Sequence, residues 1–242
     1  MPFLIRTLAC TFHGGHHVEP HAHRWGQLIY AGSGVMRVRA GRTLWIVPPA
    51  RAVWAPAGVE HEIWAQGDFA MRTLYLEPRL ADALPAEVVA IEVSPLLREL
   101  ALHAVQLGML DEGEPAQARL AQVIADQIAQ APALPLALPL PADPRAVRLA
   151  ARLRDDPACT AELHILAAEA GASPRTMQRL FLDDTGLRFS EWRQRLRLLH
   201  GATLLGAGAS VTEAGLAAGY SGTSAFIAAF RKQFGRTPAQ MR

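Results

Sequence analysis

The chain has 242 residues, of which 50% are hydrophobic and 19% are charged. This composition excludes a disordered chain, because burying so much apolar side chain offsets the conformational entropy lost on folding. It also argues against a membrane span, since Arg, His or Pro interrupts each apolar stretch before the roughly 20 residues that a bilayer requires. We expect no signal peptide, because no cation precedes the first apolar run. Two cysteines are too few for a disulfide framework, which favours a reducing, cytoplasmic setting.

The net charge of +2 divides unevenly along the chain. Residues 1–142 hold 10 arginines and 13 acidic residues, a balance of −3, whereas residues 143–242 hold 14 basic and 9 acidic residues, a balance of +5. Five prolines in residues 131–144 remove hydrogen-bond donors and predict an extended linker without helix or sheet. We therefore expect two domains, the basic one suited to phosphate groups. A solvated surface with a chance imbalance also fits the charges alone.

The first half predicts strands followed by helices. Short β-like runs punctuated by glycine and proline predict strands at 27–30, 34–40, 42–47, 52–54 and 71–76. Many short strands indicate a small barrel or sandwich. Beyond Pro95 the apolar residues recur at helical spacing, so residues 94–130 predict a hairpin of two amphipathic helices. Its apolar faces can pack on the barrel, on each other or on a second copy of the chain.

The histidines carry the chemistry of this half. His21 and His23 are two residues apart, so both rings project from one face of a strand, and Gln27 follows. A Pro-Gly turn before His61 can return that ring toward the first pair. Three imidazoles and an amide oxygen suit Zn, Ni, Fe or Mn. The alternatives are a metal-free effector pocket, or ordinary surface and core histidines, since the chain has nine.

The order His21, His23, Gln27 and Gly34, followed by Pro56, Gly58 and His61, resembles the two motifs of the cupin family. The resemblance implies a β-barrel with a central pocket. Gln27 stands where that family has a glutamate ligand, and no asparagine follows His61 at the family's distance, which implies weaker metal binding and no general base. Five aromatic residues are expected to wall the effector pocket or its rim: Trp25, Tyr30, Trp45, Trp54 and Trp64.

The second half contains a repeat. Gly171 and Gly219 are 48 residues apart, and Gly186 and Gly235 are 49 apart. Each copy, 167–186 and 215–235, has a small-residue helix, a glycine turn and a second apolar-periodic helix that stops at glycine, which is the pattern of a helix-turn-helix.

The first copy predicts a recognition helix. Ser173 is placed to cap it, and its exposed stripe carries Arg175, Gln178 and Arg179, residue types that pair with bases in a major groove. Thr176 completes the predicted DNA contacts of this helix. A merely solvated helix face is the alternative.

The second copy predicts weaker base reading. Its outward residues cannot make bidentate base contacts, although Ile227 can touch a thymine methyl group; they are Thr223, Ser224, Ile227 and Ala228. Arg231 and Lys232 are expected to contact the phosphate backbone. Gly215 lies inside a helix, where it costs about 1 kcal/mol relative to alanine.

Residues 190–205 predict a long helix between the two copies. Its arginines at positions 193, 195 and 197 are expected to face outward, and the helix separates the recognition helices by roughly 34 Å, the spacing of adjacent major grooves.

Residues 145–242 resemble the DNA-binding domain of the AraC/XylS family of transcription regulators. The resemblance rests on SPRTMQRLF at 173–181, RLRLLHGATLL at 195–205, GYS at 219–221 and AFRKQFGRTP at 229–238. It implies an α+β multidomain chain: a cupin-type sensor barrel (1–93), a dimerising helical hairpin (94–130), a proline-rich linker (131–144) and a paired helix-turn-helix domain (145–242). The segments 25–38 and 53–61 also look like those of a subgroup whose genes often lie beside an efflux transporter.

The resemblance implies a non-enzymatic regulator. Its expected partners are double-stranded DNA, a small-molecule or metal effector, a second copy of the chain and, for an activator, RNA polymerase. The alternative is a metal-dependent cupin enzyme, a dioxygenase or isomerase with a helical appendix, although Gln27 removes the expected general base.

Overall fold

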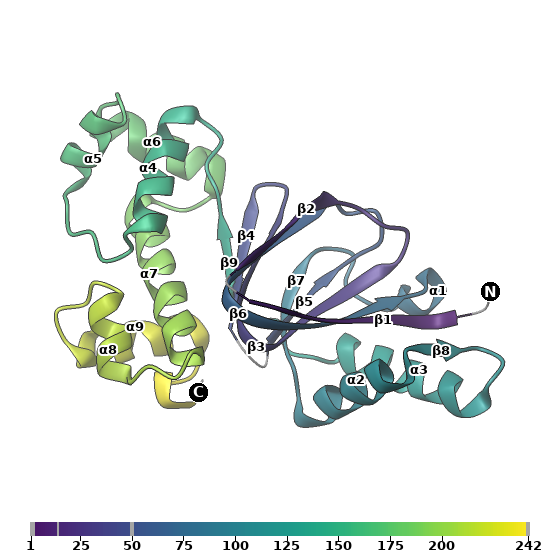
Figure 1. Ribbon diagram of the computed structural model, residues 1–242. Helices are drawn as coiled ribbons and strands as arrows, with labels where there is room; N and C mark the ends of the chain where they lie inside the picture. The colour runs from purple at the N-terminus through teal and green to yellow at the C-terminus, as the bar shows by residue number, and fades with distance from the viewer. Residues whose placement is uncertain (1–2, 14, 49–50, 241–242) are drawn as a thin grey trace. The chain divides into compact units, whose positions relative to one another are not determined.

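The computed structural model describes residues 3–13, 15–48 and 51–240, which fall into two compact units (Figure 1). The first unit comprises residues 1–41 and 47–136, and the second comprises residues 42–46 and 137–242. Within the described ranges, no helix combines the length and the apolar character needed to cross a membrane.

The first unit is a half-barrel of antiparallel strands. Its main sheet has the order β7-β5-β3-β6-β1-β8, and β2 pairs with β6. The strands are β1 (Phe3–Phe12), β2 (His16–His21), β3 (Gly26–Ala40), β5 (Arg51–Ala55), β6 (His61–Leu76), β7 (Val89–Glu92) and β8 (Met109–Asp111). The expected strand-rich first half is therefore confirmed, but the predicted strand ranges omit β1, β2, β7 and β8 and cover only the end of β6.

Strand β3 runs through Gly34, where the sequence predicted a break between two strands. The pairing register with β6 shifts around Ser33, and Gly34 adopts a φ of +76°, which marks a β-bulge. A Cβ atom at Gly34 would lie 2.4 Å from the main-chain oxygen of Asp68, so the close approach of the two strands requires glycine.

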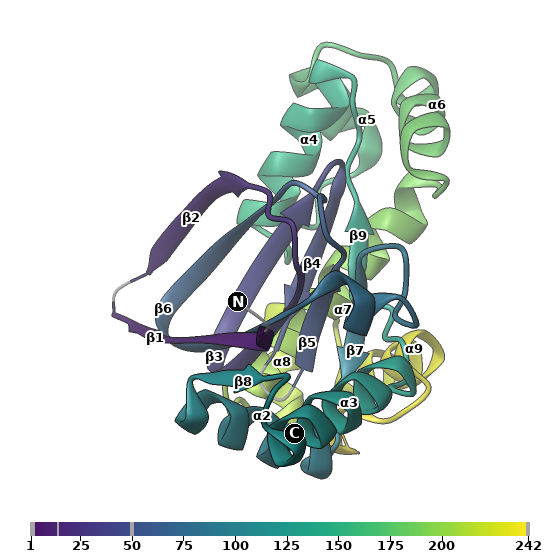
Figure 2. The same cartoon turned by 90° about the vertical axis from the view of Figure 1, so that its right-hand side faces the viewer.

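The sheet presents two different faces, because side chains alternate along each strand. On one face, Leu28, Tyr30 and Leu74 belong to a core cluster with the helices α2 (Pro95–Leu107) and α3 (Pro115–Ala129). Figure 2 shows both helices beside β8 and the sheet. Strand β8 lies between them in the chain, so the expected hairpin is interrupted by a strand, and the short helix α1 (Pro78–Ala81) precedes β7.

The second unit begins with a strand pair. β9 (Ala137–Pro139) pairs with β4 (Thr43–Val47), although the sequence predicted no sheet between residues 131 and 144. That expectation was wrong at these three residues and at Ala133, which forms an isolated antiparallel bridge with Ile91. A three-residue strand can end on Pro139, opposite Thr43, because proline is tolerated at strand ends and edges. Leu138 of this pair is fully buried.

Two helix-turn-helix motifs make up the rest of this unit, as the repeat predicted. The first is α5 (Leu163–Glu169) with α6 (Pro174–Thr185), and the second is α8 (Val211–Ala217) with α9 (Thr223–Phe234). Helix α4 (Pro144–Asp155) precedes them, α7 (Phe189–Gly206) joins them, and a 3-10 turn (Pro238–Gln240) follows. The turn residues Gly171 and Gly219 have φ values of 74° and 78°, so the repeat in sequence is also a repeat in backbone conformation.

Aromatic packing fixes each motif to α7. In the first motif, the Phe181 ring meets the Trp192 ring edge-on, with centroids 5.0 Å apart. In the second, Phe226 is fully buried, and a Cβ atom at Gly201 of α7 would lie 2.7 Å from its ring. A Cβ atom at Gly215 of α8 would lie 3.2 Å from the same side chain. Gly215 is thus not only a helix-weakening residue, because its missing side chain lets α8 lie close to the ring.

Two arginines of α7 do not face outward as expected. Arg193 and Arg197 are half-buried and donate hydrogen bonds to main-chain carbonyls of the loop between α4 and α5. The periodicity that placed them on the polar face was right, but another segment covers that face.

Candidate metal centre and DNA-binding surface

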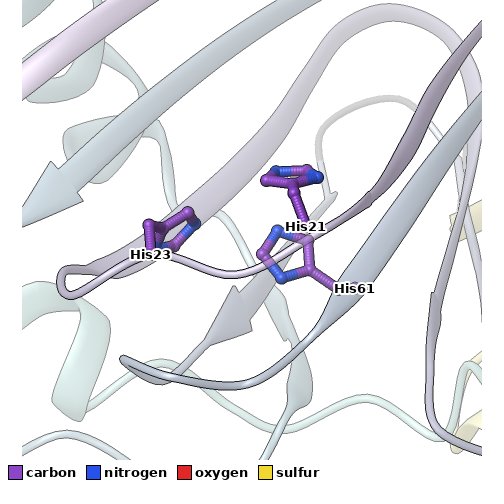
Figure 3. A group of neighbouring side chains, drawn as sticks. All are labelled: His21, His23 and His61. Carbon is purple, nitrogen blue, oxygen red and sulfur yellow. The ribbon is translucent and has the colours of Figure 1, made fainter.

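Three histidines converge in the half-barrel, as the sequence predicted (Figure 3). His21 ends β2 and lies opposite His61, the first residue of β6, while His23 follows in the connection to β3. The turn at Gly58 donates a main-chain hydrogen bond of 2.8 Å to the carbonyl of His23 and so holds the two segments together. One nitrogen from each ring lies within 4.8 Å of the others. This spacing allows all three to bind one ion.

Gln27 connects two of the rings. Its Oε1 lies 2.8 Å from His23 Nε2 and 2.8 Å from His61 Nε2. The amide is oriented by its other end, because Nε2 of Gln27 donates to Thr73 Oγ1 at 2.9 Å and that hydroxyl donates to the Leu28 carbonyl. The structure therefore brings the fourth predicted ligand to the triad with its oxygen facing the imidazoles.

The opposite nitrogens of these two rings also face oxygen atoms. His23 Nδ1 contacts the Trp25 carbonyl, and His61 Nδ1 lies 2.9 Å from the Val59 carbonyl. A neutral imidazole carries one N–H, so it cannot donate to both oxygens. With Nδ1–H donating to the carbonyl, each Nε2 lone pair faces the amide oxygen of Gln27. An extra proton, a cation bound between these atoms, or the opposite orientation of the Gln27 amide with its NH2 group toward the rings would each satisfy the contact.

Burial disfavours the extra proton on His61. The side chain is almost fully buried, and desolvation is the largest cause that lowers its pKa from 6.5 to about 4, with smaller contributions from His21 and His23. His61 is thus neutral at physiological pH, which is the form that binds a metal. The donor set fits a divalent transition metal.

Sequence reasoning missed the residues around the triad. By strand register, Gln27 lies beside Tyr75, and Tyr75 lies beside Arg6 of β1. The Tyr75 ring stands 5.2 Å from the His23 ring, and the Arg6 guanidinium lies 4.7 Å from the centre of the Trp25 ring. Period-two alternation across β6 would have indicated Thr73 and Tyr75, since both share the face of Gln27.

The five predicted pocket aromatics do not form one wall. Tyr30 and Trp54 lie in the core against the helices, on the other face of the sheet. Trp45 belongs to β4, and Trp64 stacks on His17 with ring centroids 4.9 Å apart. Of the five, Trp25 alone stands next to the histidine segment. Composition identified aromatic residues, but strand parity and the helical cover decided which face they occupy.

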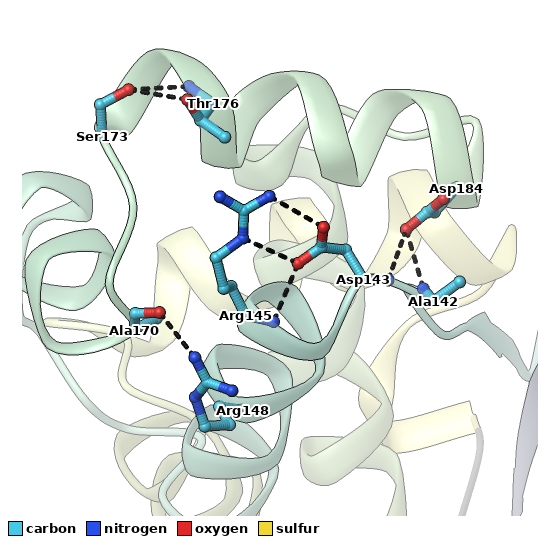
Figure 4. A network of polar contacts seen from close by, with 8 residues as sticks. All are labelled: Ala142, Asp143, Arg145, Arg148, Ala170, Ser173, Thr176 and Asp184. Atoms are coloured by element: carbon cyan, nitrogen blue, oxygen red, sulfur yellow. Dashed lines mark hydrogen bonds and ion pairs between the residues drawn. The ribbon is translucent and has the colours of Figure 1, made fainter.

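The first recognition helix presents the predicted stripe. Arg175, Gln178 and Arg179 of α6 are exposed, whereas Met177 of the same helix is fully buried. Ser173 caps the helix: its Oγ accepts a 3.1 Å hydrogen bond from the Thr176 main-chain nitrogen (Figure 4). The two hydroxyls also lie 2.9 Å apart, so Ser173 and Thr176 organise the helix start.

The second recognition helix is less polar. Ser224, Arg231 and Lys232 of α9 are exposed, while Thr223 and Ile227 are partly covered. Ser224, Arg231 and Lys232 are thus available to a partner, and α9 begins at Gly222 without a side-chain cap.

An open groove of about 1390 Å³ adjoins α6. It is lined by the exposed stripe of α6, by the start of α7 including Arg188 and Ser190, and by Tyr220. Sequence reasoning missed Arg188 and Ser190, which stand at the N-terminal end of α7, where main-chain N–H groups favour anions.

Comparison with known proteins identifies both halves. Residues 9–138 match the family described as AraC-like ligand binding domain, and residues 166–242 match a helix-turn-helix domain. The transcriptional regulator NimR of Escherichia coli K12 is 35% identical over 220 residues, which cover 91% of this chain and 80% of NimR. RipA of Corynebacterium glutamicum is 40% identical over 101 residues, covering 42% of this chain and 30% of RipA. ToxT of Vibrio cholerae aligns over 98% of this chain and 96% of its own, with 9% identity and a TM-score of 0.41.

Proposed function

The chain belongs to the AraC family of transcription regulators, and from that premise we propose that it couples a divalent metal site to sequence-specific DNA binding. Membership of the family makes the chain a DNA-binding regulator with a domain that senses a small molecule, and gives no support to the alternative of a cupin enzyme. The metal, the individual contact residues and the dimer are our proposals.

The metal proposal rests on the convergence of acceptor atoms at the triad. His21, His23 and His61 would hold the ion, with Gln27 Oε1 as a fourth, neutral ligand. Such an ion would offer a coordination position to a small-molecule effector. The effector would lie along the sheet face of Tyr75, next to the triad.

Metal content tests this proposal directly. We expect stoichiometric metal in the purified chain after exposure to Zn, Ni, Fe or Mn, and its loss in His21→Ala/His23→Ala. His103→Ala is the control, because this exposed histidine of α2 lies outside the triad. Wild-type protein that retains no metal after loading would instead support a metal-free effector site.

For DNA, we propose that Arg175, Gln178 and Arg179 read bases in a major groove. The supporting observation is that all three are exposed on one stripe of a helix whose start is capped. Helix α9 would enter a neighbouring groove, with Ser224 and Ile227 toward the bases and Arg231 and Lys232 on phosphates.

A gel-shift titration tests DNA binding. The first probe is the DNA upstream of the chain's own gene, since we expect the regulated gene to be an adjacent transporter. Binding should weaken steeply as the salt concentration rises. The protein displaces counterions from the DNA phosphates when it binds, and releasing them is less favourable at high salt. Absence of any salt-sensitive complex, with or without metal and candidate effectors, would contradict the proposal.

We also propose a homodimer through the helices α2 and α3. Their surface exposes apolar side chains, with relative exposures of 54% for Leu96, 45% for Leu107 and 41% for Val123. Sedimentation of wild type and Leu96→Glu tests this. A monomeric wild type at micromolar concentration, or a variant that still dimerises as tightly, would contradict this interface.

A further inference from the structure

The loop between α4 and α5, residues 156–162, is fastened to α7 by two arginines. Arg193 donates to the carbonyl of Ala161 at 2.8 Å and also to that of Cys159. Arg197 donates through Nε to the carbonyl of Pro157 at 3.1 Å and through Nη2 to that of Cys159 at 2.7 Å. The two guanidiniums thus share one acceptor and hold three alternate carbonyls of the loop. We call this arrangement the arginine clamp.

The clamp attaches the loop to α7 through two positively charged side chains. Within residues 3–13, 15–48 and 51–240, neither Arg193 nor Arg197 has a carboxylate partner in an ion pair. Both guanidiniums donate to main-chain oxygens, although Nε of Arg193 is buried without a hydrogen-bond partner among the described residues. Charge-assisted hydrogen bonds of this kind are stronger than neutral ones. Burial lowers the pKa of Arg193, with the charge of Arg197 adding to the effect, but arginine stays protonated at physiological pH.

The other side of the loop touches the second motif. A Cβ atom at Gly219, in the turn between α8 and α9, would lie 3.0 Å from Ala158 Cα and 3.1 Å from Arg197 Nη2. Gly219 also has a φ of 78°, so the turn depends on glycine for both its conformation and its space. The loop directly precedes the first motif in the sequence, yet its far side lies against the turn of the second motif.

The clamp also borders the DNA-binding surface. Arg193, Arg197 and Tyr220 line the same groove as Arg175 and Arg179 of the first recognition helix. The residues that join the two motifs are therefore neighbours of those proposed to read DNA.

We propose that Arg193 and Arg197 are positioning residues that fix the two helix-turn-helix motifs relative to each other, and thereby set the spacing of the two DNA half-sites that the chain accepts. Helix α7 alone would fix the distance between the points at which the two motifs are attached, but not the rotation of each motif about its point. The clamped loop adds a second connection beside it, which restrains the motifs against rotation about their attachment points. The inference rests on the DNA-binding role of this domain.

The first test measures the distance between the motifs without DNA. Spin labels at Asp183→Cys in α6 and Ala225→Cys in α9, both exposed positions, report this distance in the full chain after Cys10 and Cys159 are replaced by serine. We expect one narrow distance peak in this background. The Arg193→Ala/Arg197→Ala variant should give a broad or split distribution.

Arg148→Ala is the matched control. Arg148 makes the same kind of bond, from a guanidinium to the Ala170 carbonyl at 2.9 Å, but this bond joins α4 to the end of α5 rather than α7 to the loop (Figure 4). Its loss should leave the distance peak narrow. A narrow peak in the double variant, or equal broadening in Arg148→Ala, would overturn the proposal. If circular dichroism shows that the double variant does not fold, Arg197→Lys is used instead. A lysine can keep a hydrogen bond to one carbonyl, but it cannot reproduce the two bonds that the planar guanidinium makes at once.

The second test measures spacing preference on DNA. A duplex selected by the wild-type chain from a random library is compared with the same duplex carrying one extra base pair between its half-sites. We expect the inserted base pair to weaken binding of the wild-type chain about tenfold or more. The same insertion should weaken binding of the Arg197→Lys variant by a clearly smaller factor. Equal sensitivity in both proteins would refute the role in spacing. Failure of wild type to select any duplex would contradict the DNA-binding role itself, while the label distances would still decide the clamp.

Discussion

Acidification of the metal-free chain should destabilise the half-barrel through one histidine. The pKa of His61 falls from 6.5 to about 4 in the folded protein, chiefly because the ring is buried. The unfolded chain therefore binds a proton at this residue more readily than the folded one. Stability from His61 is complete above pH 6.5 and is lost as the pH falls from 6.5 toward 4. A depression of this size is equivalent to roughly 3 kcal/mol of unfolding free energy.

Urea unfolding of the metal-free chain at several pH values measures this loss. Tryptophan fluorescence is a suitable signal, since four of the five tryptophans lie between residues 25 and 64. Carboxylates also titrate toward pH 4, so the contribution of His61 is the difference between wild type and His61→Gln. Glutamine can keep a hydrogen bond to Gln27 without gaining a charge. His103→Gln, on the exposed face of α2, controls for loss of a histidine elsewhere.

Imidazole NMR signals give the pKa itself. With His61→Gln to assign the resonance, His61 should remain neutral down to about pH 5, well below the ordinary value for histidine. A measured pKa near 6.5, or parallel stability curves for wild type and His61→Gln between pH 6.5 and 4, would refute the reasoning from burial. Bound metal should protect the half-barrel over the same pH range, because its ligands must be neutral.

Four further substitutions probe the second unit. Arg179→Ala should remove discrimination between cognate and mutated half-sites, whereas Arg231→Ala should weaken binding to all sequences alike; competition gel shifts separate the two effects. Ser173→Ala removes the cap of α6 and should lower stability by about 1 kcal/mol in denaturant unfolding; an unchanged midpoint would contradict the capping role. Gly201→Ala places a Cβ atom 2.7 Å from the Phe226 ring, so we expect a loss of about 1–3 kcal/mol from overpacking, checked by the thermal melting temperature.

The histidine triad was predictable because spacing alone constrains it. His21 and His23 are only two residues apart, and a Pro-Gly turn before His61 returns the chain toward them. The prediction that both lie on a strand was wrong, because β2 ends at His21 and the Gly58 turn holds His23 in the following connection. The effector-pocket aromatics were not predictable in this way. Tyr30 and Trp54 lie on strands, but which face of a strand is covered depends on helices that follow 41 to 99 residues further along the chain.

The second unit shows the same division between local and distant information. Equal glycine spacing predicted two motifs, because the turn conformation at Gly171 and Gly219 is local. The direction of Arg193 and Arg197 is not local, since it depends on a loop that returns to α7 from some 35 residues earlier in the chain. Helical periodicity identifies a polar face, and only the tertiary fold decides whether water or carbonyl oxygens meet it.

The pairing of β4 with β9 affects how the chain can be divided experimentally. Because residues 42–46 belong with residues 137–242, the backbone passes between the units three times: after residue 41, after residue 46 and after residue 136. A protease that cuts between residues 131 and 136 would therefore leave the fragments attached through a strand rather than release a separate DNA-binding piece. A truncated protein that begins at residue 137 would also lack the partner of β9, leaving Leu138 without its strand neighbour Leu44.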